Sequence, residues 1–525
     1  MIKKPAIYYF LAITLALPAL LWNLQIVPFI GDEAIRAIVA LEMTISHQWI
    51  VPTINGDFYF SKPPLYNWII IFSNYIWGGP SEWASRTPTV LFTLVFCWLI
   101  YFFHKKQFKI TQHNWLIGLM FLTCGRILFW DSFLGLIDIF YSMMTYLMFM
   151  LMYTFGKVRR YALFYFSAYT ISALGFLLKG YPSVAFLGLS LLGYFFYSKD
   201  WKKIFLPAHF LSAIWSMLLV GSYFWAYDYY RDAGDTVGPL LEQATRRTVL
   251  VHTPGEVLLH LVSYPFENLY HFLPWSLMIV LCMRKDFFAA IRENDFIYFN
   301  FIILAANLWV YWISPEVYPR YILMLIPLSF SIFLFFYEKE KEYSTWRVKV
   351  LSYLLKTIIL LIPVSVLAGF LTPDIKFIPN SYLKLSVLFV ALALMAWFYF
   401  RDQPNRPVIL VLVVLFLRIG FDVMVLPVRA SKGDNPVCKK ETLRIAEKYK
   451  TRDLFISGNS DMWYVNAFYL AQGRNKITYR KQQLEKGKYY ITDADRVDID
   501  TSRFIIKDSF QDCEFFYCHY VFTPK

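Results

Sequence analysis

GDEAIRAIVALEMTISHQWIVPTINGDFYFSKPP, residues 31–64, is the polar stretch around which this chain is organised. It follows the first long apolar segment directly and is the least lipid-like part of the first hundred residues. Four acids, two bases and a double proline gather in it, namely Asp32, Glu33, Glu42, Asp57, Arg36, Lys62, Pro63 and Pro64. Asp32 and Glu33 stand where a helix would begin, and the N-terminus of a helix stabilises a carboxylate. These residue types fit a capped surface helix as well as they fit a functional site.

The composition around this stretch is that of a membrane protein. Of the 525 residues 58% are hydrophobic and only 17% are charged. The apolar residues come in runs of about twenty, the length that crosses a bilayer core of about 30 Å. We predict thirteen spans, near residues 5–27, 84–103, 113–130, 135–156, 161–178, 182–197, 204–226, 262–283, 296–314, 321–337, 350–371, 383–400 and 407–426. No small-residue cleavage site follows the first, so we expect it to be retained as a span.

The positions of Lys and Arg set the orientation, because cytoplasmic loops carry an excess of both. With the N-terminus inside, alternate loops hold Lys3 and Lys4; Lys105, Lys106 and Lys109; Lys157, Arg159 and Arg160; Lys199, Lys202 and Lys203; Arg284, Lys285 and Arg292; Lys339, Lys341, Arg347 and Lys349; and Arg401 and Arg406. Loops on the other side typically hold one base each. The net charge of +14 is therefore mostly a topology signal, and nucleic acid is not an expected partner.

An odd number of spans places the C-terminus outside. The last hundred residues are more polar, with short strands predicted at 453–458, 488–493 and 503–508 and a helix at 440–450. We therefore expect a polytopic all-α membrane domain over 1–427 and a small extracytoplasmic α/β domain over 428–525. In that compartment Cys438, Cys513 and Cys518 could form a disulfide, and the pairing stays open. The remaining cysteines lie in or beside spans as packing residues.

The predicted outer loops collect ionisable side chains at the ends of spans. The first, residues 28–83, continues into LYNWIIIFSNYIW, which we interpret as a helix lying in the membrane interface. Later outer positions add Arg86, Arg126, Asp131, Asp138, Lys179, Arg246, Arg247, Arg320 and Tyr321. Charged groups at the membrane boundary are costly and mark functional sites by default. Competing interpretations are a solvated loop acid for Asp131, a lone interfacial acid for Asp138 and a snorkelling lysine for Lys179.

The loop at residues 227–261 is long and of mixed charge, which suits a mobile cover over a cleft. Beneath it, several cations and one or two carboxylates could converge on one outer-face cavity. The cations would bind a lipid-linked phosphate, while a carboxylate takes a proton from an attacking hydroxyl or orients it.

A likeness over about residues 5–340 is carried by ordered motifs, namely GDEAIRAIVALEM, WIVPTINGDFYFSKPPL, SEWASRTPTVLF, GLIDIFYS, LLKGYP, FLPWS and YPRYILMLIP. Together they resemble the GT-C membrane glycosyltransferases, and more narrowly the branch of lipid A aminoarabinose transferase, kin of the protein O-mannosyltransferases. The resemblance implies GT-C architecture in a bacterial inner membrane with a periplasmic C-terminal domain. It also implies sugar transfer, with inversion, from a polyprenyl-phosphate donor to a lipid, glycan or protein acceptor at the periplasmic face.

The resemblance also assigns roles to particular residues. It makes Asp32 the catalytic carboxylate, supported by Asp138, and it places Lys62 on the donor phosphate. We expect Arg86, Arg126, Lys179 and Arg320 to bind the donor phosphate as well. The remaining substrate-site candidates are Glu33, Tyr59, Asp131, Arg246, Arg247 and Tyr321.

The chain departs from the family pattern in two places. Ser61 stands where relatives often carry an acid associated with a metal site, so we predict no such site and no cofactor, with a divalent metal left open. Arg36 stands one position later than the arginine usually seen after the Asp-Glu pair, which puts its role in doubt.

Two other functions remain open at this point. A transporter or flippase for a lipid-linked sugar would need polar groups at mid-membrane and an internal repeat, and the sequence shows neither. The third alternative is an inactive scaffold whose C-terminal domain binds a partner.

Overall fold

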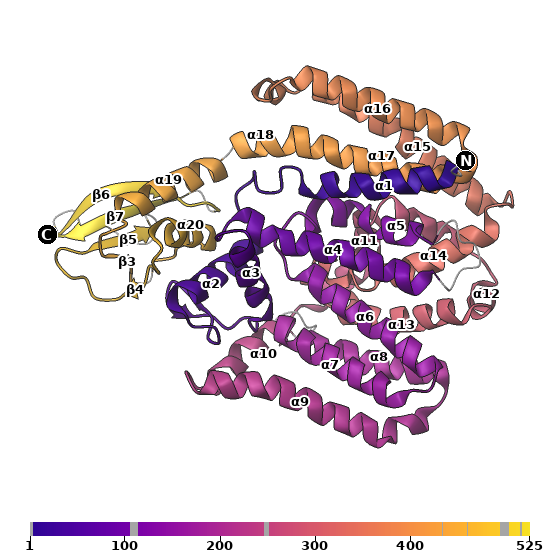
Figure 1. Cartoon of the computed structure of the whole chain (residues 1–525), viewed down its shortest axis with the longest axis horizontal. Helices are drawn as coiled ribbons and strands as arrows, with labels where there is room; N and C mark the ends of the chain where they lie inside the picture. The colour runs from indigo at the N-terminus through magenta and orange to yellow at the C-terminus, as the bar shows by residue number, and fades with distance from the viewer. Residues whose placement is uncertain are drawn as a thin grey trace.

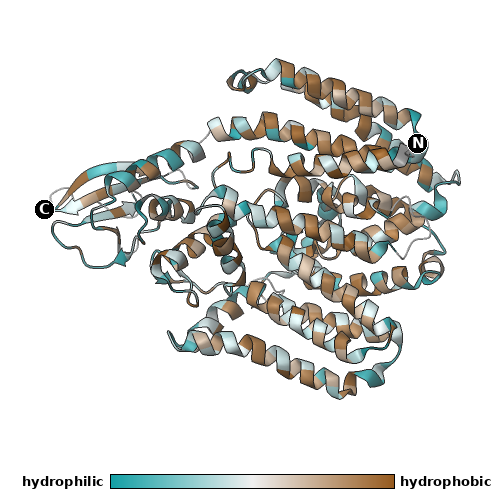
Figure 2. Ribbon diagram, viewed as in Figure 1, coloured by the Kyte–Doolittle hydropathy of each residue, from teal (hydrophilic) through white to brown (hydrophobic). Residues whose placement is uncertain are grey.

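The computed structural model describes residues 4–105, 114–245, 251–432, 434–458, 460–493, 503–514 and 517–525. Figure 1 shows helices running side by side in one elongated body, with a small sheet beyond one end. The N-terminus lies at the end of the body far from that sheet. Apolar residues dominate the helices of the body, while polar ones gather in the connections and around the sheet (Figure 2). Lys3, Lys106, Lys109, Arg246 and Arg247 lie outside the described residues.

The helical body accounts for most of the described chain. Its α-helices are α1 (Lys4–Leu21), α2 (Asp32–Ser46), α3 (Leu65–Ile76), α4 (Glu82–His104), α5 (Leu116–Leu122), α6 (Asp138–Lys157), α7 (Tyr161–Lys179), α8 (Pro182–Ser198), α9 (Pro207–Asp228), α10 (Val237–Thr245), α11 (Pro254–His271), α12 (Phe287–Arg292), α13 (Asp295–Trp312), α14 (Ile326–Glu340), α15 (Trp346–Gly369), α16 (Ser381–Arg401), α17 (Arg406–Gly420) and α18 (Leu426–Ser431). Short 3-10 or π turns connect them, namely η2 (Ile127–Asp131), η3 (Trp201–Phe205), η4 (Ala233–Thr236), η5 (Trp275–Cys282), η6 (Pro319–Ile322), η7 (Pro373–Phe377), η8 (Gln403–Asn405) and η9 (Phe421–Val425).

The polytopic helical class is confirmed, although the number of crossings stays a prediction. In the described part of the chain, eight helical segments are long and apolar enough to span a membrane, and α1 and α8 are shorter apolar helices. Helical structure also occupies the other three predicted spans, but none is one long helix. The segment 113–130 holds α5 and most of η2, 262–283 holds part of α11 followed by η5, and 321–337 holds the end of η6 and most of α14.

Two of these interrupted spans are hydrogen-bonded to each other at their breaks. The backbone N–H of Gly125 donates to the carbonyl of Leu273 at 2.8 Å, so the break after α5 meets the break after α11. The indole of Trp275 donates to the hydroxyl of Thr123 at 2.9 Å. Irregular backbone is tolerated at membrane depth when protein satisfies its polar groups. Hydropathy cannot reveal such a pair, because it contains no information about the partner segment.

The predicted first outer loop, residues 28–83, is a compact unit. α2 is followed by a hairpin of β1 (Thr53–Ile54) and β2 (Asp57–Phe58), and then by α3, whose 12 residues are too few to span a bilayer. Asn55 and Gly56 both have positive φ, as the tightest hairpin turns require. The buried carboxylate of Glu42 accepts from the hydroxyl of Thr53 and from the N–H groups of Asn55 and Gly56. This acid of residues 31–64 therefore holds the hairpin in place.

The C-terminal residues fold into a five-stranded sheet of order β4-β3-β5-β7-β6 with two helices. Its elements are α19 (Asp434–Lys448), β3 (Leu454–Ser457), α20 (Tyr464–Arg474), β4 (Arg480–Lys481), β5 (Tyr489–Asp493), β6 (Phe504–Gln511) and β7 (Cys518–Pro524). β3 is parallel to β4 and β5, whereas β7 is antiparallel to β5 and β6. Strands occur at all three predicted positions, and α19 covers most of the predicted helix. A disulfide joins Cys438 to Cys513, with Cα atoms 5.3 Å apart, and Cys518 is exposed.

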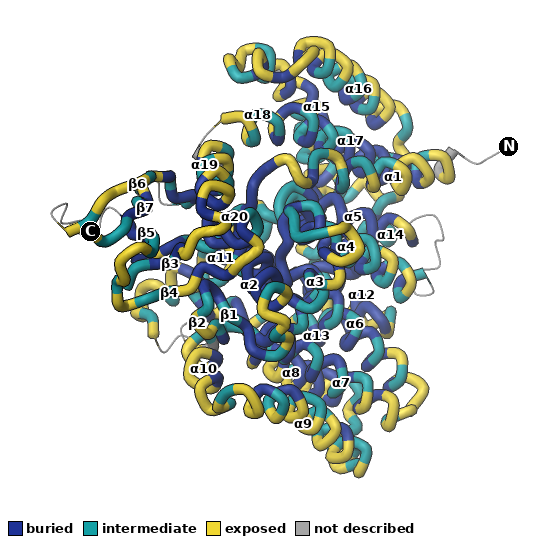
Figure 3. The backbone as a smooth tube through the Cα atoms, turned by 60° about the vertical axis from the view of Figure 1, so that its left-hand side comes forward, coloured by how far each residue is buried: buried dark blue, intermediate teal, exposed yellow. Residues whose placement is uncertain are grey.

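This C-terminal unit packs on the first outer loop. Phe29, before α2, meets Phe468 of α20 edge to face, with ring centroids 4.8 Å apart. The hydroxyl of Tyr469 donates to Glu82, at the start of α4, at 2.7 Å. A side chain at Gly56 would collide with the ring of Tyr479, so the hairpin turn also lies against this unit. Figure 3 shows α2 and α20 meeting in a largely buried region.

Candidate active site

Asp32 and Glu33 are adjacent at the start of α2, yet their side chains lie in opposite environments. The Asp32 carboxylate is 62% exposed, whereas that of Glu33 is fully buried. The residue before them, Gly31, makes no side-chain cap, and Asp32 instead accepts a hydrogen bond from the Arg320 guanidinium at 2.7 Å. The capping interpretation of Asp32 is therefore not what the structure shows. The exposed acid faces outward, while its neighbour belongs to the core.

Glu33 and Arg86 form a buried structural pair. Arg86 donates from Nε and Nη2 to the two carboxylate oxygens of Glu33, at 3.0 and 2.5 Å. Its other N–H groups bond the carbonyl oxygens of Leu24, Val27 and Pro28, at 2.7, 2.9 and 3.1 Å. All five donors of the guanidinium are thus used. We therefore revise two expectations, because Arg86 has no N–H left for a phosphate and Glu33 has no access to a substrate.

Glu33 also ties the first outer loop to the second. It accepts hydrogen bonds from the backbone N–H of Ile30, at 2.8 Å, and from that of Gly135, at 2.8 Å. Gly135 lies three residues before Asp138, in the GLIDIF motif. The pair of Glu33 and Arg86 therefore fixes the backbone that carries Asp32 against the backbone that carries Asp138.

A chain of four alternating charges joins the predicted outer loops. Arg320, in η6, lies 2.7 Å from Asp32 and 3.2 Å from Asp138, and Lys179 lies 2.6 Å from the other oxygen of Asp138. The side chains of Asp138, Lys179 and Arg320 are 2–9% exposed, so Asp32 is the exposed end of the chain. Four elements far apart in sequence supply these residues. The predicted convergence of Asp32, Asp138, Lys179 and Arg320 is therefore present.

The two cations of this charge network, Lys179 and Arg320, bind carboxylates. They are not the free phosphate ligands that we expect from the sequence. Lys179 ends on Asp138, with its ammonium 4.0 Å from the ring centroid of Tyr321 and 5.0 Å from that of Tyr141. This buried position is not that of a snorkelling lysine. Tyr321, a predicted substrate-site residue, is itself 2% exposed and packs on Lys179. In this structure Arg320 and Lys179 orient carboxylates.

The remaining predicted cations and Asp131 lie around the same chain of charges. Lys62 is half-buried and interacts electrostatically with Asp138. Arg126 donates to Asp131 at 3.1 Å, and Asp131 interacts electrostatically with Asp138 and Arg320. Asp131 is 1% exposed, so it is not a solvated loop acid. Its second oxygen has no hydrogen-bond partner among the described residues. Lys62 and Arg126 therefore remain candidates for contact with a phosphate.

Tyr59 and the C-terminal unit form a cleft beside Asp32. The hydroxyl of Tyr59 accepts from Arg36 at 2.9 Å and is hydrogen-bonded to Ser61. A cavity of about 630 Å³ separates the first-loop hairpin from the C-terminal unit, lined by Ile54, Asn55, Asp57, Phe58, Tyr59, Asp461, Met462, Trp463, Tyr464, Arg480 and Tyr517. Tyr464 interacts electrostatically with Asp32, and burial raises its pKa. The exposed acid therefore lies near a cleft rich in aromatic side chains.

Sequence reasoning missed most of this cleft. Asp57 and Arg480 form an ion pair at 3.0 Å across it, although 423 positions separate them in the chain. No pattern in a single sequence indicates such a contact. Within the described ranges no group of three or more His, Cys, Asp or Glu residues could hold a metal, and Ser61 takes part in the hydroxyl contact with Tyr59. The absence of a metal site remains a prediction.

Parts of the sequence are similar to known proteins. A family model described as dolichyl-phosphate-mannose-protein mannosyltransferase matches residues 61–227. The chain is 28% identical over 187 residues to the undecaprenyl phosphate-alpha-4-amino-4-deoxy-L-arabinose arabinosyl transferase of Edwardsiella ictaluri (strain 93-146), over 35% of this chain and 34% of that protein. It is 30% identical over 171 residues to the protein of that name from Wigglesworthia glossinidia brevipalpis, over 32% of this chain and 30% of that protein. The alignments thus span about a third of the length of these relatives.

The similarity of fold extends over the whole chain. The crystal structure of ArnT from Cupriavidus metallidurans bound to undecaprenyl phosphate superposes with a TM-score of 0.72 and 17% identity, over 98% of this chain and 97% of that one. The fold is therefore that of a polytopic helical membrane protein and is shared with this ArnT structure. In fold the chain is similar to ArnT, and over residues 61–227 its sequence is similar to the protein mannosyltransferases.

Proposed function

We propose that this protein is an integral-membrane glycosyltransferase that moves a sugar from a polyprenyl-phosphate donor to an acceptor at the periplasmic face of a bacterial inner membrane. One observation carries the proposal. Of the four acids gathered here, Glu33, Asp131 and Asp138 are buried, and only Asp32 offers its carboxylate to an incoming group. The names of the curated relatives support a polyprenyl-phosphate donor, and the undecaprenyl phosphate bound to the similar ArnT structure supports a site for the spent carrier.

The proposed reaction exchanges one bond for another at the anomeric carbon. An acceptor oxygen forms a bond to that carbon while the bond between the carbon and the donor phosphate oxygen breaks. The electron pair of the broken bond stays on the polyprenyl phosphate, whose charge Lys62 and Arg126 stabilise. Asp32 accepts the proton of an acceptor hydroxyl, or orients an acceptor that is already ionised. Attack opposite the leaving phosphate would invert the configuration at the sugar.

Arg320 is assigned a positioning role in this scheme. Its guanidinium bridges Asp32 and Asp138 in a rigid fork, which holds the exposed carboxylate in one direction. Asp138 is itself held by Lys179 and keeps the Arg320 guanidinium in place. The position of a reacting carboxylate strongly affects the reaction rate, since a small displacement lowers the rate by a large factor.

The acceptor would enter through the cleft between the first-loop hairpin and the C-terminal unit. Its mixture of aromatic rings with Asp57, Asp461 and Arg480 suits a polar headgroup with hydroxyl or phosphate groups. A lipid, a glycan or a protein side chain could supply such a group. On this proposal the C-terminal unit is part of the active site. The alternative of an inactive scaffold is then not needed to explain this unit.

A transporter or flippase is not favoured by the buried charges within the predicted spans. Arg418 and Asp422 form a buried ion pair in the last span, at 3.0 Å. Arg418 also donates to the carbonyl oxygens of Ala19 and Leu128, at 3.0 and 2.7 Å. These bonds connect three helical segments, so the pair is part of the packing rather than a lining of a pathway.

Replacing Lys62 tests the donor side of the site. We expect Lys62→Ala to weaken use of the donor about ten- to a hundredfold, because a charge-assisted phosphate contact is worth about 1.5–3 kcal/mol. The matched control is Lys376→Ala, which removes an exposed lysine predicted on the same face. The measurement is the affinity of a non-hydrolysable donor analogue. Equal affinity for wild type and Lys62→Ala would remove Lys62 from the phosphate site.

Replacing Trp463 tests the acceptor side. We expect Trp463→Ala to raise the KM for the acceptor about tenfold and to leave the KM for the donor unchanged, because the ring lines the cleft on the side of the C-terminal unit. Trp346→Ala, at the other end of the body, is the control and should change neither constant. A rise in the donor KM instead would place the donor in this cleft.

Mass spectrometry of lipids and glycans from cells with and without this gene tests the function itself. Loss of one sugar from one envelope lipid or glycan on deletion, restored by wild type and not by Asp32→Asn, is the expected result. An unchanged set of glycosylated molecules under conditions where the protein is abundant would contradict the proposal.

A further inference from the structure

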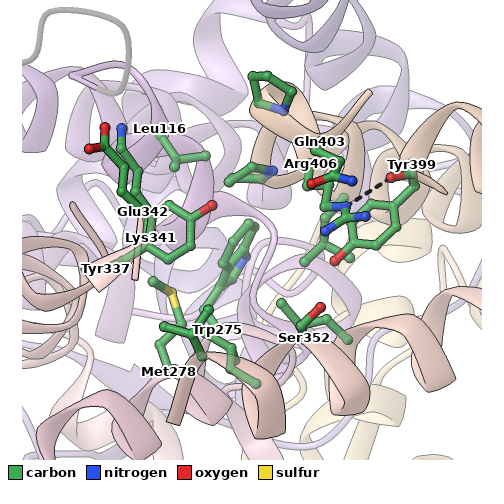
Figure 4. Close-up of a pocket in the computed structure, with 16 residues that line it drawn as sticks. Leu116, Trp275, Met278, Tyr337, Lys341, Glu342, Ser352, Tyr399, Gln403 and Arg406 are labelled. Atoms are coloured by element: carbon green, nitrogen blue, oxygen red, sulfur yellow. Dashed lines mark hydrogen bonds between the residues drawn. The ribbon is translucent and has the colours of Figure 1, made fainter. Parts of the chain in front are cut away.

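A second cavity, of about 420 Å³, lies at the end of the helical body opposite the candidate active site. Its walls come from the C-terminal ends of α14 and α16 and from the beginnings of α5, α15 and α17 (Figure 4). Arg320 precedes α14 at the active-site end and Lys341 follows it at the cavity end. Since α14 alone is about 22 Å long, nearly the thickness of a bilayer core separates the two places.

Two basic residues line this cavity from different sides. Figure 4 shows Lys341 and Glu342 on one side and Arg406 with Tyr399 on the other. Arg406 donates through Nε to the carbonyl oxygen of Tyr399 at 3.1 Å. No described residue accepts a hydrogen bond from its terminal nitrogens. Lys341 is paired with Glu338 at 2.9 Å and remains about a quarter exposed.

Arg406 differs in this respect from other bases at the same end. Lys339 is paired with Glu293 at 2.7 Å, and Arg347 is paired with Glu340 at 2.9 Å. Among the described residues no carboxylate lies within ion-pair distance of Arg406. The lining of the cavity holds two cations and the carboxylate of Glu342, and since Glu338 already pairs with Lys341, the fork of Arg406 is the group available to an anion.

The base of the cavity is apolar. Trp275, Met278, Leu351 and Leu410 line it and are all buried. A site with a cationic rim over an apolar base matches an amphiphile that carries a phosphate at the start of a hydrocarbon chain. A volume of about 420 Å³ holds a headgroup and the first part of a chain.

We propose that this cavity binds the headgroup of an anionic glycerophospholipid from the leaflet on the side of the basic loops. The phosphodiester would lie between Arg406 and Lys341, and the acyl chain would pass over Trp275. Basic pockets between spans on the cytoplasmic side are known to attract anionic lipids, because the surface potential and the fixed cations act together. This inference rests on the predicted topology and not on the proposed reaction.

Lipid retention by the purified full-length protein tests the proposal. The protein is reconstituted in nanodiscs of phosphatidylcholine with one-tenth phosphatidylglycerol, extracted into mild detergent and analysed by native mass spectrometry. Wild type is expected to retain phosphatidylglycerol over phosphatidylcholine, and Lys341→Gln/Arg406→Gln to lose this retention at least about tenfold. The control Lys349→Gln/Arg401→Gln removes two exposed bases of the same face outside the cavity and should behave as wild type.

A second variant guards against a general effect of charge removal. Ser352 lines the cavity, so Ser352→Phe fills it and keeps both cations. It should abolish retention as well. Equal retention by both cavity variants and the control would overturn the proposal. Displacement of the lipid by inorganic phosphate alone would show a free-phosphate site instead, and preferential retention of undecaprenyl phosphate would assign the cavity to the carrier lipid. Either result would also overturn it.

Discussion

Asp32→Asn is expected to lower turnover about 100- to 10,000-fold, the usual cost of losing a general base, while the protein still folds. The substitution keeps the shape of the side chain and an oxygen that can accept from Arg320, so the fork of Arg320 and Asp138 stays in place. What is lost is the negative charge at the exposed end of the network. Turnover of a polyprenyl-phosphate sugar by the purified variant is the measurement.

The control for this variant is Asp235→Asn. Asp235 is an exposed acid on another predicted outer loop that pairs with Arg231 at 2.8 Å, and its loss should leave turnover unchanged. Near-normal turnover in Asp32→Asn would remove the catalytic role from Asp32. The role would then pass to Asp138, although that carboxylate is buried between Lys179 and Arg320.

Arg86→Met is expected to lower the stability of the folded protein by about 3–5 kcal/mol, the cost of leaving a buried charge without its partner. The guanidinium is fully buried and satisfies both oxygens of Glu33 and three backbone carbonyls. Its removal leaves the Glu33 carboxylate buried with only the N–H groups of Ile30 and Gly135. The measurement is the midpoint of thermal unfolding, followed by size-exclusion chromatography in detergent.

Two further variants separate stability from function at this pair. Lys450→Met breaks an exposed pair with Glu447 and should cost less than about 1 kcal/mol. Arg86→Met/Glu33→Gln removes both charges and should recover part of the stability, since no unpaired charge is then buried. If Arg86→Met unfolds at the temperature of wild type and loses donor affinity, Arg86 is a phosphate ligand after all.

The sequence predicted the class of fold through runs of apolar residues and could not predict how some spans are broken. The hydropathy of residues 113–130 and 262–283 resembles that of ordinary spans. A hydrogen bond between Gly125 and Leu273 joins the two breaks, and neither residue carries a visible signal of the other. Long, regular spans such as α15 and α16 leave no such ambiguity.

The candidate site was also predictable only in part, because a motif does not show what each side chain contacts. Motifs identified Asp32, Asp138, Lys179 and Arg320 as a group, because each follows or begins a predicted span on one face. They could not distinguish a cation that orients an acid from one that awaits a phosphate. Arg86 has the residue type and position of a phosphate ligand, and only its burial and five bonds show a structural role.

On the proposed function, this protein breaks the bond between a sugar and a polyprenyl phosphate. The most direct measurement is release of undecaprenyl phosphate from a panel of undecaprenyl-phosphate sugars by the purified, reconstituted protein, with a membrane lipid extract as acceptor, followed by mass spectrometry. The predicted result is release from at least one donor, matched by a glycosylated acceptor and absent in Asp32→Asn. No release from any donor by a folded protein that binds undecaprenyl phosphate would contradict the claim.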